Sequence, residues 1–289
     1  LRKNNVDVYI TGSNSKFLST DIMTEFRGRG DEIRISPLAF SEFYPACGKE
    51  KADAWQEYLY FGGLPHILSE ADYEAKSNYL SRLHREIYMR DLCDRYDILD
   101  RRGMESLMKV ISSAIGSLSN PQKIADTFKS SGEKVISMPT ISNYLKYLEE
   151  SFLVSKVERY DIKGRKYIST PFKYYYMDLG LRNALLNFRQ FEEPHLMENA
   201  IYNELIYRGF NVDVGVVEVR KDDNGKKIRK KLEVDFVVNH ASRRYYIQSA
   251  FALRDQEKIE QEQASLLNIP DSFKKIIISG SNTPIWRNE

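Results

Sequence analysis

The chain has 289 residues, of which 42% are hydrophobic, 12% aromatic and 29% charged. This composition excludes a disordered or low-complexity chain, because enough apolar surface is present to offset the entropy of ordering. The net charge of +2 excludes a histone-like polycation. It leaves nucleic-acid binding open, because the clustering of charge matters more than its sum.

The residue types that mark other compartments and metal sites are scarce. Two cysteines, Cys47 and Cys93, cannot form a disulfide framework in a chain of this length, which favours a reducing cytoplasm. No apolar run approaches the roughly 18 residues that span a bilayer, so we expect a cytoplasmic protein with no membrane partner. The four histidines are scattered and no CxxC or HExxH occurs, so a zinc site is not expected.

The first third of the chain alternates between strand-like and helical patterns. A strand-like run at 6–10 ends in the polar turn 11–15, and a helix is predicted over 15–26. The strand begins so close to Leu1 that we expect the start of this domain to be missing. Helices are predicted over 38–46 and 52–61, and the pattern is helical from 73 to about 118.

The remaining segments predict two further units. A helix over 121–129, a second over 140–151 and a hairpin over 152–169 follow the element order of a winged helix. A new α/β unit then contains a helix over 197–208, strands at 212–220, 232–238 and 244–250, a helix over 254–267 and a strand at 276–278.

Three segments near the start resemble the second half of a prokaryotic AAA+-type ATPase. They are Val8-Tyr9-Ile10-Thr11-Gly12-Ser13-Asn14-Ser15, Phe26-Arg27-Gly28-Arg29 and Ser36-Pro37-Leu38-Ala39-Phe40-Ser41-Glu42-Phe43, with Gly62-Gly63-Leu64-Pro65 resembling the lid that follows. The resemblance implies that Ser13 or Asn14 is the sensor-1 residue near the γ-phosphate. It also implies that Arg27 or Arg29 is the arginine finger, which neutralises charge on the transferring phosphoryl group. The alternative is a polar turn with a solvated arginine pair.

The nucleotide-binding half of that family has no counterpart in the sequence. No GxxxxGK[ST] occurs to cradle phosphates, and no apolar strand ends in Asp-Glu to hold Mg²⁺. We therefore expect no cofactor in this chain and no ATP hydrolysis by it alone. ATP and Mg²⁺ are expected in a longer parent protein.

The segment 120–170 resembles the winged helix that follows the lid in these proteins. Double-stranded DNA would then contact the helix at 140–150 and the turn of the hairpin. The candidate residues are Thr140, Ser142, Asn143 and Lys146 on the helix, and Lys163, Arg165 and Lys166 in the wing. The alternative is that the winged helix docks a protein partner or a second copy of the chain.

The last unit resembles the domain of unknown function that ends this family, and that domain is similar to the PD-(D/E)XK nuclease fold. The resemblance implies carboxylates at Glu198 or Glu204 and at Asp235 that converge on Mg²⁺, with Glu198 and Asp235 as the metal candidates. The third strand should read acid-x-Lys but reads Gln248-Ser249-Ala250, so we expect a degenerate site. A migrated cation from Arg254 or Lys258 is the alternative.

The sequence as a whole predicts a mixed α/β multidomain protein. The expected units are a remnant of the AAA+ core at 1–47, a helical lid and connector at 48–118, a winged helix at 119–170 and a restriction-endonuclease-like α/β domain at 171–289. The favoured function is the C-terminal part of a DNA-associated ATPase with an inactive nuclease-like domain. A drifted Mg²⁺-dependent nuclease and a protein-interaction module are the alternatives. Tyr174-Tyr175-Tyr176 invites a base-stacking hypothesis, but core packing is favoured.

Overall fold

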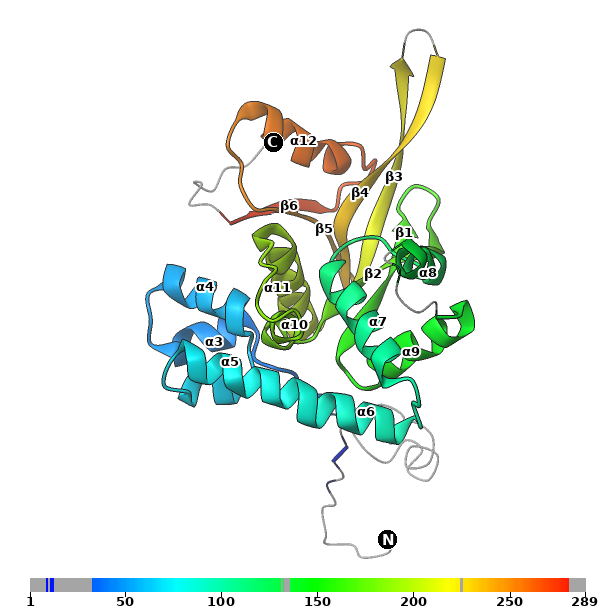
Figure 1. The fold of residues 1–289 in the computed structure, drawn as a ribbon. Coiled ribbons are helices and arrows are strands. Elements are labelled where there is room, and N and C mark those ends of the chain that lie inside the picture. Colours follow the sequence, from blue (N-terminus) through cyan, green and yellow to red (C-terminus); the bar gives the residue numbers. More distant parts are fainter. Residues whose placement is uncertain are drawn as a thin grey trace, which may run out of the picture.

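The computed structural model of the chain describes residues 9, 11–12, 33–130, 132, 136–223 and 226–280. Within these residues a group of helices packs against a six-stranded mixed sheet, which confirms a mixed α/β protein (Figure 1). The candidates Ser13, Asn14, Arg27 and Arg29 lie outside the described residues.

The first half of the described chain is helical. Its elements are α3 (Phe40–Cys47), α4 (Lys51–Phe61), the short helix η2 (Pro65–Ser69), α5 (Tyr73–Arg82), the π-helical turn η3 (Leu83–Tyr88), α6 (Met89–Arg95) and α7 (Arg101–Ser113). Helix α5, η3 and α6 run on as one long helix along the base of the molecule (Figure 1). Helix α7 begins at Arg101 because the Asp100 carboxylate accepts a hydrogen bond from the Gly103 N–H at 3.0 Å.

Two further helices and a hairpin follow. They are α8 (Pro121–Ser130), α9 (Met138–Glu150), β1 (Val154–Asp161) and β2 (Lys166–Tyr176). Ile141, Tyr144, Leu145 and Leu148 of α9 are all buried, as their helical spacing predicts. Ser119, between α7 and α8, forms an isolated antiparallel bridge with Phe172 of β2.

The sheet has the strand order β2-β1-β3-β4-β5-β6, with β3 (Asn211–Asp223), β4 (Lys226–His240), β5 (Arg243–Ala250) and β6 (Lys274–Ser279). Strand β1 runs parallel to β3, and β5 runs parallel to β6, while the other neighbours are antiparallel. The hairpin expected as a wing therefore shares one sheet with the strands expected as a nuclease core. The unit boundary predicted after residue 170 falls within β2.

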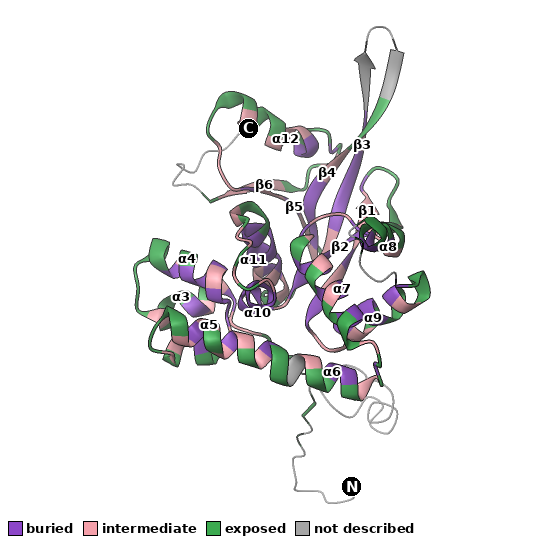
Figure 2. Cartoon of the chain, viewed as in Figure 1, coloured by how far each residue is buried: buried purple, intermediate pink, exposed green. Residues whose placement is uncertain are grey.

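Two helices cover opposite faces of this sheet (Figures 1 and 2). Helix α11 (Glu193–Tyr207) packs on one face through Met197 and Ile201, against Phe236 and other strand residues. Helix α12 (Gln256–Leu267) packs on the other face through Leu266, against Val237 and its neighbours. Tyr174, Tyr175 and Tyr176 are 3%, 0% and 2% exposed, which confirms that this run packs in the core.

A buried carboxylate connects the helical part to the sheet through α10 (Leu179–Leu185). Asp178 caps this helix and accepts hydrogen bonds from the N–H groups of Leu181 at 2.9 Å and Gly63 at 2.8 Å. Gly62 has a φ of +75°, and a Cβ at this position would collide with the Asp178 carboxylate, so the turn requires glycine. Burial raises the pKa of Asp178 to about 6, although the backbone N–H groups oppose this shift.

Candidate functional site

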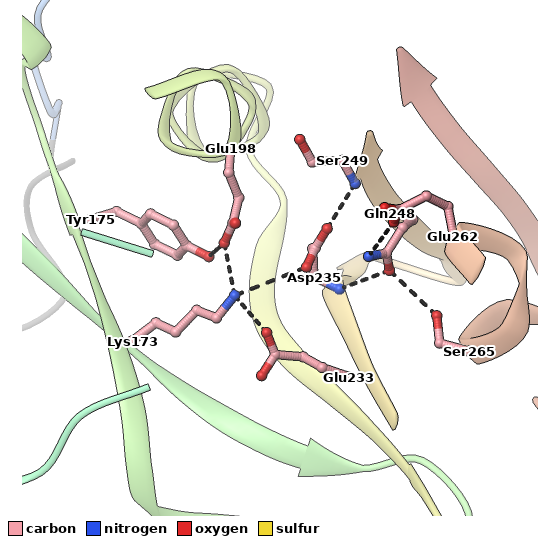
Figure 3. Close-up of polar contacts among 9 residues, drawn as sticks. All are labelled: Lys173, Tyr175, Glu198, Glu233, Asp235, Gln248, Ser249, Glu262 and Ser265. Carbon is pink, nitrogen blue, oxygen red and sulfur yellow. Dashed lines mark hydrogen bonds and ion pairs between the residues drawn. The ribbon is translucent and has the colours of Figure 1, made fainter. Parts of the chain in front are cut away.

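Three carboxylates surround one buried lysine between α11 and the sheet (Figure 3). The Lys173 ammonium lies 2.8 Å from Glu198 Oε1, 2.7 Å from Glu233 Oε1 and 3.9 Å from Asp235 Oδ1. Lys173 is 2% exposed, Glu198 8% and Asp235 7%. These four residues are called the carboxylate–lysine centre, and they come from β2, α11 and β4.

The alternation of β2 places Lys173 in this centre. Tyr174 and Tyr176 pack into the helical core, whereas Tyr175 packs beneath α11, so Lys173 points to the α11 side with Tyr175. The Tyr175 hydroxyl donates to Glu198 Oε1 at 2.5 Å, the same oxygen that Lys173 contacts. Two side chains of β2, those of Lys173 and Tyr175, therefore fix the position of the Glu198 carboxylate.

A β-bulge in β4 positions the third carboxylate. Gly215 of β3 is opposite Val234, and Asp213 is opposite Val237, so β4 has one more residue than β3 in this interval. The extra residue falls at Asp235 or Phe236. Bulges of this kind redirect side chains and are frequent beside functional sites.

The centre carries more negative than positive charge. Burial alone would lower the pKa of Lys173, but the attraction of Glu198, Glu233 and Asp235 outweighs it, and the pKa lies above its usual value. Burial raises the pKa of Asp235, and repulsion from Glu198 adds to the shift, while Lys173 opposes it. The ammonium thus stays charged, and Asp235 takes up a proton at a higher pH than an exposed aspartate does.

Gln248 belongs to a neighbouring network toward α12. Its Oε1 lies 3.4 Å from the Asp235 backbone N–H and 3.4 Å from the Ser265 hydroxyl, and both groups donate to it. Its Nε2 donates to Glu262 at 3.3 Å. Asp235 connects this network to the centre, because its Oδ2 accepts from the Ser249 N–H at 2.8 Å.

The cation near the carboxylates comes from a position that the sequence analysis missed. Ala250, where the nuclease pattern expects lysine, is buried, and Lys258 pairs with Glu262 at 2.7 Å. Glu204 pairs with Arg208 at 2.6 Å. The available signal for Lys173 was a lone charged residue within the aromatic run 172–176. Such a residue is seldom buried without a partner.

The geometry does not fit a divalent metal at this centre. Among the described residues, no group of three or more His, Cys, Asp or Glu side chains is arranged to hold a metal ion. The oxygens of Glu198 and Glu233 bind the Lys173 ammonium, so a metal ion would have to displace a buried charge. No hydrolytic step through Mg²⁺ follows from this arrangement.

The helix candidates for DNA contact lie together on α9. Ser142, Asn143 and Lys146 are exposed and Thr140 is half-buried. The Ser142 hydroxyl donates to the Met138 carbonyl at 3.0 Å, and Lys146 lies 3.7 Å from Glu150. Thr140 Oγ1 lies 2.8 Å from the hydroxyl of the N-cap residue Ser137. The polar face of α9 is accessible, although three of its four candidates already have a partner.

The hairpin candidates lie at the other end of β1, in the turn to β2. Lys163, Arg165 and Lys166 are all exposed. The Lys163 ammonium donates to the Glu218 carbonyl of β3 at 2.8 Å, which fixes the turn against the sheet. The turn itself is stabilised by Asp161, whose carboxylate accepts from the Gly164 N–H at 2.8 Å.

Comparison with known proteins associates the chain with AAA-type ATPases. A family model described as an AAA domain matches residues 1–44, and a model for a domain of unknown function, DUF8612, matches residues 52–192. An uncharacterized protein of Haemophilus influenzae is 34% identical over 282 residues, which cover 96% of this chain and 66% of the relative. An uncharacterized protein of Methanocaldococcus jannaschii is 29% identical over 91% of this chain and 59% of its own length.

The chain therefore spans about two thirds or less of these two relatives. No solved structure matched it. In the part of the chain that the structure describes, no helix is long and apolar enough to cross a membrane.

Proposed function

We propose that this chain is the C-terminal part of an AAA-type ATPase. We further propose that it binds DNA through helix α9 and the β1–β2 turn and that its carboxylate–lysine centre does not cleave DNA. The observation that carries the proposal is the buried Lys173 ammonium among Glu198, Glu233 and Asp235. Hydrolysis on a nuclease-like scaffold needs these carboxylates to hold Mg²⁺, and here they bind a fixed cation. ATP hydrolysis, with ATP and Mg²⁺ as cofactors, is assigned to the longer parent protein.

Double-stranded DNA is the proposed partner of helix α9 and the β1–β2 turn. The element order supports a winged helix, since helices α7, α8 and α9 are followed by the β1–β2 hairpin. The bridge between Ser119, which lies between α7 and α8, and Phe172 adds a third short strand to this hairpin. Exposed Lys146, Arg165 and Lys166 can neutralise phosphates, and Asn143 can reach a base edge.

Duplex binding by the full chain is expected to weaken as salt rises, because each neutralised phosphate releases counterions. Lys146→Ala and the double variant Arg165→Ala/Lys166→Ala should each weaken binding of unrelated duplexes to a similar degree. Each should also lower the slope of log K against log salt by about one per lost phosphate contact. Fluorescence anisotropy across a salt series measures both quantities.

Lys51→Ala is the matched control for these variants, because Lys51 is an exposed lysine on α4, far from α9 (Figure 1). It should bind as the unmodified chain does. Binding that is insensitive to salt, or equal losses in the control and the α9 variant, would contradict the proposed surface.

A metal-dependent nuclease is the second candidate, and one distance favours it. Lys173 Nζ lies 3.9 Å from Asp235 Oδ1, and nucleases of this type use a lysine beside the attacking water. We expect no plasmid cleavage with Mg²⁺ or Mn²⁺. Cleavage that Asp235→Ala abolishes, but that Asp72→Ala on the exposed start of α5 leaves intact, would establish the nuclease instead.

A further inference from the structure

Aromatic rings and one arginine form a continuous row across one end of the sheet, on the face that α12 covers in part. The ring centroids of Tyr167 and Tyr160 are 5.4 Å apart. The Arg244 guanidinium carbon lies 5.6 Å from the ring centroid of Tyr160 and 5.5 Å from that of Phe273. These four residues, called the aromatic row, extend from the edge strand β2 to the segment before β6.

The strand register explains why residues so far apart in sequence meet. Tyr160 and Tyr167 are directly opposite in the β1–β2 hairpin, and on its other side Tyr160 is opposite Gly215 of β3. Glycine has no side chain to separate Tyr160 from residues of the strands beyond it. Arg244 is the second residue of β5 and is fixed by a hydrogen bond from its Nε to Asn239 Oδ1 at 2.8 Å.

The row is accessible, unlike the buried tyrosines of β2. Tyr167 is 63% exposed and Phe273 is 43% exposed, while Tyr160 and Arg244 are half-buried. Exposed rings on a sheet, with an arginine held against two of them, offer flat surfaces on which other planar groups can stack.

Exposed cations adjoin both ends of the row in the sequence. The β1–β2 turn carries the exposed residues Lys163, Arg165 and Lys166 beside Tyr167, and the exposed residues Arg243 and Lys274 adjoin Arg244 and Phe273 in sequence.

The carboxylates near the row already have partners. Asp213 accepts from the Tyr167 hydroxyl at 3.3 Å, and Asp271 accepts from the Tyr246 hydroxyl at 2.6 Å. Glu158 lies 3.5 Å from the Lys156 ammonium. A hydroxyl partner carries no charge and does not neutralise a carboxylate. The six cations Lys163, Arg165, Lys166, Arg243, Arg244 and Lys274 nevertheless outnumber the nearby carboxylates Glu158, Asp161, Asp213 and Asp271, which favours a polyanionic ligand.

We propose that the aromatic row binds single-stranded nucleic acid, with bases stacked on Tyr167 and Phe273 and phosphates against the flanking cations. A duplex does not satisfy this surface, because its bases present only their edges, whereas an unpaired strand exposes the faces that stack on rings. The inference adds a single-strand site to the duplex surface proposed above. It can be tested separately, because the row contains no residue of α9.

The test is fluorescence anisotropy of the full chain with labelled oligothymidylate and oligouridylate of about 20 nucleotides each, and with a duplex of the same length. Tyr167→Ala and Phe273→Ala should each weaken single-strand binding by about tenfold, because each removes one stacking surface. Tyr167→Phe keeps the ring and should bind as the unmodified chain does, whereas Tyr167→Leu should lose affinity as the alanine variant does. The two oligonucleotides show whether DNA or RNA is preferred.

Tyr207→Ala is the matched control, because Tyr207 is a tyrosine 51% exposed on α11, outside the row. It should leave single-strand affinity unchanged. The inference is overturned if the chain binds neither oligonucleotide, or if Tyr167→Leu binds as well as Tyr167→Phe. Duplex binding should respond to Lys146→Ala and not to Phe273→Ala, so failure of either site can be recognised independently of the other.

Discussion

Lys173→Met is expected to destabilise the folded chain by about 3–5 kcal/mol at about pH 8, because it leaves three carboxylates in a buried site without their cation. Methionine matches the length of the lysine stem, so the loss of charge is the main change. Chemical denaturation followed by circular dichroism measures the free energy of unfolding. Lys166→Met, on the exposed start of the same strand, should change it by less than about 0.5 kcal/mol.

The cost of Lys173→Met should depend on pH. Without the ammonium, the pKa of Asp235 rises further above its unfolded value, since burial and Glu198 already raise it. A carboxyl group whose pKa is raised in the folded state contributes stability at low pH, and this contribution is lost as pH rises through that pKa. The variant should therefore lose less stability at about pH 5 than at about pH 8.

A partial rescue separates electrostatics from packing. Lys173→Met/Asp235→Asn removes one of the three carboxylates and should recover part of the lost stability at about pH 8. An equal loss at both pH values, with no recovery in the double variant, would show that Lys173 acts only through the packing of its stem.

Asp178→Ala is expected to destabilise the fold by about 4 kcal/mol, because it leaves the buried N–H groups of Gly63 and Leu181 without an acceptor. Asp72→Ala is the matched control. Asp72 caps α5 and accepts from the Ala75 N–H at 2.8 Å in an exposed position, so its loss should cost about 1 kcal/mol. Similar losses in the two variants would contradict a special role for the Asp178 junction.

Asp178→Asn tests the electrostatic part of the same junction. The folded pKa of Asp178 is about 6, above the usual aspartate value of 3.8, so its stabilising contribution is complete at low pH and is lost as pH rises through about 6. Asparagine does not titrate. The stability difference between the unmodified chain and Asp178→Asn should therefore shrink between about pH 4 and about pH 7.5. A difference that grows over this range would show that the pKa is lowered instead.

Most helices and strands could be predicted from the sequence, because each depends on a short local pattern. The stripe Ile141, Tyr144, Leu145 and Leu148 identified α9, and the run Ile276–Ile278 identified β6. The register of the hairpin could not be read in this way. Its second strand continues to Tyr176, because Lys173, Tyr174 and Tyr175 pair with β1 deep in the core.

The chemistry of the candidate site was only partly visible in the sequence. Glu198 and Asp235 were selected as carboxylates, and the structure brings them together. The cation was expected from the strand or helix nearest in sequence, whereas it comes from β2, which is separated from β4 by the two strands β1 and β3. Strand order depends on how whole elements pack, and no local pattern encodes it.

The aromatic row, too, was predictable from the sequence only in part. Composition and spacing establish a chain rich in tyrosine with alternating strands, and they correctly indicate that Tyr174-Tyr175-Tyr176 packs inside. Only the folded sheet brings Tyr160, Arg244 and Phe273 within reach of one another. Local periodicity depends on neighbouring residues, whereas a surface built from β1, β5 and the segment before β6 depends on contacts between residues more than 80 positions apart.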